Sequence, residues 1–115
     1  MRPNCTNIVH IDSGDRNYSI NIPIRNCANT FINFYSTTVP PEYIPEGERN
    51  GVYYNSHYKI DPTHCTLTDS IETNDAYIID ISVPHNVVNQ NTSFRMNLLI
   101  RCADNERMLE ILTDN

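Results

Sequence analysis

Several stretches of this chain alternate apolar and polar residues with period two, and no stretch keeps a helical period for long. Because a strand points successive side chains to opposite faces, this alternation predicts sheets with one dry and one wet face. The sequence therefore predicts an all-β scaffold, a class that more often binds and assembles than catalyses. The clearest alternation spans residues 94–102, where one face carries Phe94, Met96, Leu98, Ile100 and Cys102.

The length and charge of the chain limit what it can be. A chain of 115 residues fits one domain with a single core. Its net charge of −6 would repel the phosphates of nucleic acids and anionic membrane surfaces, so we expect neither as a partner. No apolar run approaches the roughly 20 residues of a membrane-spanning helix, and residues 1–5 lack the apolar part of a signal peptide. We therefore expect no membrane insertion.

Turn signals recur at strand-length intervals and predict an antiparallel β-sandwich, jelly-roll-like in its connections. We expect residues 1–16 to form an N-terminal arm and residues 17–115 a single β-sandwich domain. Residues 18–25 are predicted as an edge strand, because Pro23 cannot donate to a sheet ladder. Further strands are predicted at 30–39 and 52–60, a hairpin at 65–71 and 77–83, a polar loop at 85–93, and a short strand or helical turn at 107–113. The predicted common core is Tyr77, Ile79, Ile81, Phe94, Met96, Leu98 and Ile100.

The four cysteines, at positions 5, 27, 65 and 102, are spaced unlike any zinc motif. Free thiols are the simpler interpretation in the absence of an export signal, while the even count leaves one or two disulfides open. The disulfide state of Cys5, Cys27, Cys65 and Cys102 is therefore an open alternative at this point.

The sequence offers little catalytic or metal-binding chemistry. His57, His64, Cys65 and Cys102 are one candidate metal set, but His64 and Cys65 are adjacent and would point to opposite faces of a strand. The run from Asp12 to Asp15 resembles a calcium loop superficially and is better explained as a tight turn. No nucleophile motif or phosphate-binding glycine loop is present. We expect a protein that is not an enzyme and holds no metal or cofactor.

Residues 40–51 form a predicted loop that is rich in proline and glutamate. It carries Tyr43 and Ile44, and Tyr53 follows it. Tyrosine is favoured at protein interfaces because it joins apolar area to a polar tip. We expect this loop to contact another protein. The alternative is that Tyr43 and Ile44 fold back as a lid over one end of the sandwich.

The segments 9–17, 18–27, 32–40 and 50–55 together resemble minor virion proteins of nucleocytoplasmic large DNA viruses. These proteins open with an "IDS-x-x-R" arm, which here runs from Ile11 to Arg16. The resemblance implies a β-rich minor capsid protein that cements arrays of major capsid protein. It implies a place in the virion, and in the host cytoplasm during assembly, and no catalytic residues. The alternatives are a secreted or surface disulfide-containing ligand-binding module and a small inhibitor of a host factor. With the loop, the resemblance selects five partner-binding residues: Tyr43, Ile44, Tyr53, Asp12 and Arg16.

Overall fold

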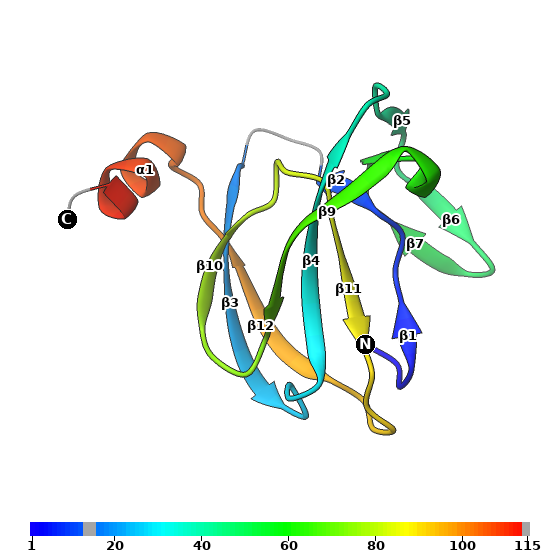
Figure 1. Ribbon diagram of the computed structural model, residues 1–115, viewed down its shortest axis with the longest axis vertical. Coiled ribbons are helices and arrows are strands. Elements are labelled where there is room, and N and C mark those ends of the chain that lie inside the picture. The colour runs from blue at the N-terminus through cyan, green and yellow to red at the C-terminus, as the bar shows by residue number, and fades with distance from the viewer. Residues whose placement is uncertain (13–15, 114–115) are drawn as a thin grey trace.

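The computed structural model describes residues 1–12 and 16–113, and they form an all-β sandwich of antiparallel sheets packed against each other (Figure 1). This confirms the predicted fold class, while a jelly-roll connectivity stays a prediction. The larger sheet has seven strands in the order β5 (Glu42–Ile44), β8 (His57–Lys59), β2 (His10–Asp12), β11 (His85–Asn89), β4 (Thr30–Thr37) and β9 (Cys65–Glu72), with β1 (Cys5–Thr6) also pairing with β11.

The second layer is a three-stranded sheet with the order β10 (Tyr77–Asp80), β3 (Tyr18–Arg25) and β12 (Met96–Arg101). A separate hairpin joins β6 (Gly47–Arg49) to β7 (Val52–Tyr54). Its turn is Asn50-Gly51, and both residues have positive φ, 53° and 77°. Such a pair suits the tight turns that match strand twist. The predicted strand at 52–60 is thus divided between β7 in this hairpin and β8 in the larger sheet.

The N-terminal residues, predicted as an arm, contribute β1 and β2 to the larger sheet. Asn89 at the end of β11 is almost fully buried, and its side-chain amide donates to the carbonyls of Arg2 (2.9 Å) and Ser93 (3.2 Å). The Met1 ammonium donates to the Arg95 carbonyl at 2.9 Å. These bonds hold the first residues of the chain against the end of β11 and the segment before β12.

Residues 85–89 form β11, which lies inside the larger sheet between β2 and β4, so the prediction of a polar loop across 85–93 is wrong there. His85, Asn86 and Asn89 are buried in it. Their polar side chains are tolerated because the fold supplies partners: the Asn86 amide oxygen accepts from the Tyr35 hydroxyl at 3.0 Å. A strand with so many polar residues cannot be recognised as buried from its composition alone.

The predicted hairpin between 65–71 and 77–83 is also wrong. Its two arms become β9 and β10, which lie in different sheets and pair with β4 and β3. The chain crosses between the layers at Thr73, whose backbone N–H donates to the Thr30 carbonyl at 2.8 Å. The crossing point is therefore fixed by a buried contact rather than by a hairpin turn.

Strand β3 is the central strand of its sheet rather than the predicted edge. Pro23 is accommodated because the pairing with β10 stops at Asn21. On the other side Pro23 lies opposite Asn97, beside a register shift between Met96 and Asn97. Irregular pairing of this kind is where a sheet tolerates proline.

The hydrophobic core lies between β4 and β10 and centres on Ile32, Ile79 and Ile81. Two of these belong to the predicted core, and Tyr77 packs against them. The other four predicted members point to solvent, with exposed fractions of 66% (Phe94), 58% (Met96), 49% (Leu98) and 44% (Ile100). The prediction of strand was right for β12, and the prediction of its inward face was wrong.

The chain ends in helix α1 (Asn105–Thr113), where the sequence predicted a short strand or one helical turn. Figure 1 shows α1 standing clear of both sheets, and none of its described residues is buried. Within the described part of the chain, no helix has the length and hydrophobicity needed to cross a membrane.

Candidate functional site

Two strands of the three-stranded sheet, β3 and β12, have an unusual distribution of polarity. Their solvent face is aliphatic and their inner face is largely polar, whereas β10 contributes Ile79 to the hydrophobic core. The strand register lines up Ile78, Ile20 and Ile100 as one row across all three strands, and Leu98 lies opposite Ile22. We call this surface the outer face. Its members are Ile20, Ile22 and Ile24 of β3, Ile78 of β10, and Met96, Leu98 and Ile100 of β12.

Polar side chains from the same strands point between the sheets. Ser19 and Asn21 are buried, and Asn21 accepts a hydrogen bond from the Asn97 amide. Arg95, just before β12, is buried too, and burial lowers the pKa of its guanidinium. Together with core residues these side chains line a cavity of about 190 Å³. Because successive side chains of a strand point to opposite faces, the inward polar groups of β3 and β12 place their aliphatic neighbours on the solvent side, although Leu99 also faces the cavity.

Helix α1 adds a second apolar surface near the same strands. Leu109, Ile111 and Leu112 are all exposed on it. The Asn105 side chain accepts from the Asn17 backbone N–H at 2.8 Å, and the Cys102 N–H donates to the Tyr18 carbonyl at 3.0 Å. These two bonds fix the start of α1 beside the start of β3.

The predicted partner-binding residues fall in different places. Tyr43 is exposed on the edge strand β5, with its ring 5.4 Å from that of Tyr58 on β8. Ile44 is half-buried beside it, and Arg16 is exposed at the start of the segment that leads to β3. Tyr53 is exposed in the β6–β7 hairpin. Its hydroxyl donates to the Glu46 carboxylate, which raises the pKa of Tyr53.

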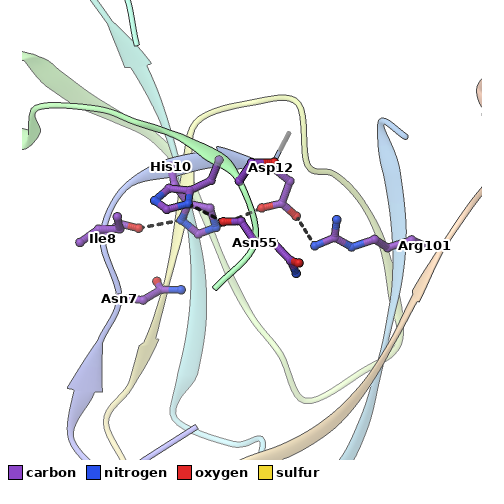
Figure 2. A pocket seen from close by; sticks show the side chains of 8 residues that line it. Asn7, Ile8, His10, Asp12, Asn55 and Arg101 are labelled. Atoms are coloured by element: carbon purple, nitrogen blue, oxygen red, sulfur yellow. Dashed lines mark hydrogen bonds and ion pairs between the residues drawn. The ribbon is translucent and has the colours of Figure 1, made fainter. Parts of the chain in front are cut away.

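Asp12, the fifth predicted partner residue, lies instead in a cluster of ionisable side chains (Figure 2). Its Oδ1 is 3.2 Å from His10 Nε2 and 3.9 Å from His85 Nε2, and its Oδ2 is 3.2 Å from Arg101 Nη2. The arrangement follows from the strands: His10 and Asp12 are two residues apart on β2 and share a face. His85 is the direct partner of His10 on β11. We call His10, Asp12 and His85 the His–Asp cluster.

The pKa values of the two histidines in the His–Asp cluster are shifted in opposite directions. Burial by itself lowers the pKa of His10, but the hydrogen bonds to Asp12 and to the Ile8 carbonyl outweigh burial, so the pKa is raised. Burial dominates at His85 and lowers its pKa. Burial would raise the pKa of Asp12, and the His10 hydrogen bond and the nearby positive charges lower it below its usual value. The carboxylate is therefore ionised and surrounded by nitrogen groups.

The metal set weighed from sequence is not brought together. The Cys65 thiol donates to the Asp61 carbonyl at 3.3 Å, and His57 lies on β8. Among the described residues, the His–Asp cluster is the group of potential ligands whose donor atoms all lie within 4.8 Å of one another. Sequence reasoning missed it because His85 was assigned to a loop. The His10-x-Asp12 spacing on a strand was the available signal. Residues 13–15 of the calcium-like run lie outside the described residues.

All four cysteines are unpaired in the structure, in agreement with the free-thiol interpretation.

No protein-family model, curated protein or solved structure matches this chain.

Proposed function

We propose that this protein is a structural assembly subunit, a β-sandwich that is built into a larger protein shell. The observation that carries the proposal is the outer face. Five of its aliphatic side chains are 40–58% exposed. Together they expose on the order of several hundred Å² of contiguous apolar surface, the size at which a patch marks a binding site rather than ordinary surface. A folded chain gains nothing from such a face until another surface covers it.

The resemblance of residues 8–55 to minor virion proteins favours a viral capsid as the assembly, with major capsid protein and other capsid proteins as partners. In this proposal the edge strand β5 and the exposed Tyr43 contact capsid proteins. An unpaired sheet edge can accept a strand from a neighbour.

We assign the outer face to a second copy of this chain. A stable interface buries roughly 800 Å² on each partner, more than the sheet face alone offers. Helix α1 supplies the rest, because it begins beside β3 and carries Leu109, Ile111 and Leu112 on its surface. In a two-fold dimer the same patch meets itself, so α1 of each copy would cover the sheet of the other.

Sedimentation velocity of the full chain at high micromolar concentration tests this assignment. We expect a dimer for the wild type and a monomer for Leu98→Asp, because a carboxylate in the centre of the outer face would have to be desolvated. The matched control is Leu67→Asp. Leu67 is as exposed as Leu98 but lies on β9 of the other sheet, so this variant should stay dimeric. A monomeric wild type, or a Leu98→Asp variant that still dimerises, would overturn the assignment.

The capsid contact is tested separately with the double variant Tyr43→Ser and Ile44→Ser. We expect an unchanged melting temperature and reduced co-sedimentation with capsid particles, since Tyr43 is exposed on an edge strand. Lost thermal stability with unchanged co-sedimentation would instead make these residues a lid over their own sheet.

A further inference from the structure

The His–Asp cluster has the construction of a metal site. The His10 Nδ1 lies 2.8 Å from the Ile8 carbonyl oxygen, and the His85 Nδ1 lies 2.7 Å from the Val83 carbonyl oxygen. A carbonyl oxygen can only accept, so both Nδ1 atoms carry the hydrogen. Each neutral ring then turns the lone pair of its Nε2 towards Asp12 Oδ1. Metal-binding histidines are held in this way, with the second ring nitrogen donating to a backbone carbonyl or carboxylate.

Three acceptor atoms thus converge without a donor between them when both rings are neutral. We propose that His10, Asp12 and His85 bind a divalent zinc ion through His10 Nε2, His85 Nε2 and Asp12 Oδ1. Two imidazoles and one carboxylate match the ligands zinc takes in proteins, whereas calcium and magnesium prefer oxygen alone. Arg101 on the other carboxylate oxygen would hold Asp12 in orientation.

The distances suit the ion. Zinc bonds to nitrogen and oxygen of about 2.0–2.2 Å place tetrahedral ligand atoms roughly 3.3 Å apart. His10 Nε2 and Asp12 Oδ1 already lie 3.2 Å apart. His85 Nε2 lies 3.9 Å from Asp12 Oδ1, and all three ligand atoms lie within 4.8 Å of one another, so a shift of the His85 ring would bring them to bonding geometry. His85 is nearly inaccessible to solvent, and Asp12 and His10 are mostly covered, so the three atoms form a built site rather than a surface coincidence.

A fourth position faces a cavity of about 250 Å³ that His57 also lines. His57 is the direct partner of Asp12 on β8, and its ring lies 6.4 Å from that of His10. Its Nδ1 is 2.9 Å from the Asn55 carbonyl, the same arrangement as in the two cluster histidines. His57 is not among the residues whose ligand atoms lie within 4.8 Å of one another, so in this geometry a water molecule from the cavity would complete the coordination.

A bound ion would link two parts of the larger sheet where few backbone pairs join them. A single register pair, His10 with His85, joins β2 to β11, and so links the strands β5, β8 and β2 to the strands β11, β4 and β9. An ion bound only by the folded chain stabilises it in proportion to its occupancy.

Isothermal titration calorimetry of the full chain with zinc chloride, after treatment with a chelator, tests the proposal. We expect one ion per chain and a rise in melting temperature. Asp12→Asn keeps the shape of the side chain and should weaken binding by more than about tenfold, as should His10→Ala. The matched control His64→Ala removes an exposed histidine outside the cluster and should bind zinc like the wild type.

Cobalt(II) in place of zinc separates this site from the four thiols. Ligation by nitrogen and oxygen gives visible d–d bands without the near-ultraviolet charge-transfer band of a cobalt–thiolate bond. Absence of binding to the wild type, a thiolate band, or unchanged affinity in both Asp12→Asn and His10→Ala would overturn the proposal. The circular dichroism spectrum of each chelator-treated variant establishes that it is folded, and the isosteric Asp12→Asn keeps the test decisive where His10→Ala does not fold.

Discussion

Two threonines at the crossing between the layers show how single residues hold this fold. Thr30 and Thr73 have exposed fractions of 0% and 2%, and their hydroxyls hydrogen-bond to each other. The Thr30 hydroxyl donates its hydrogen to the Cys27 carbonyl, so the Thr73 hydroxyl is the donor in the bond between the two threonines. Buried polar groups are stable only with such partners. The pair therefore fixes the point where the chain leaves β9 for β10.

We expect Thr73→Val, which keeps the side-chain shape, to lower the free energy of unfolding by about 1–3 kcal/mol, because it removes one member of a buried network. The measurement is urea denaturation of the chelator-treated protein. Thr68→Val is the control: Thr68 is an exposed β9 residue bonded to the Phe34 carbonyl, and its loss should change stability by less than about 0.5 kcal/mol. Equal effects of the two substitutions would contradict a special role for the buried pair.

At the scale of elements, period-two alternation predicted β3 and β12 well, because it reports strand geometry directly. It could not decide which face is covered. The usual rule turns apolar side chains inward, and it placed Leu98 in the core. In the structure Asn97 and Arg95 occupy the inner side, where Asn21 pairs with Asn97. Only the sheet partners determine this outcome, and they are distant in sequence.

The face assignment yields a stability prediction. Ile32→Ala should cost about 2–5 kcal/mol, because Ile32 is fully buried in the core and leaves a cavity. Leu98→Ala should cost less than about 1 kcal/mol in the monomer, since its side chain is half in water already. Thermal or urea unfolding in dilute solution, below the dimerisation range, compares the two variants. If Leu98→Ala lowered the free energy of unfolding nearly as much as Ile32→Ala, the assignment of Leu98 to the solvent face would be wrong.

For the whole molecule, the all-β fold class could be predicted from the sequence, but the strand order and the His–Asp cluster could not. Both depend on β11, whose histidine and asparagines resemble a loop in composition. The cluster then follows, because His85 can meet His10 only if β11 lies beside β2. The N-terminal segment could not be placed either, since its partners Asn89 and Arg95 lie at the other end of the chain.

The strand order also predicts how the molecule opens. The buried core of Ile32, Ile79 and Ile81 lies among β4, β10 and their neighbours, whereas β5 and β8 are three-residue strands and β6–β7 is an isolated hairpin. Short strands with few buried apolar contacts open at low free energy. We therefore expect amides of β4, β9 and β11 to exchange with deuterium much more slowly than those of β5 to β8. Hydrogen-exchange mass spectrometry of the chelator-treated chain measures this difference directly. Uniform protection along the larger sheet would contradict the prediction. It would mean that the two parts of the sheet open together even without a bound ion, although a single register pair joins β2 to β11.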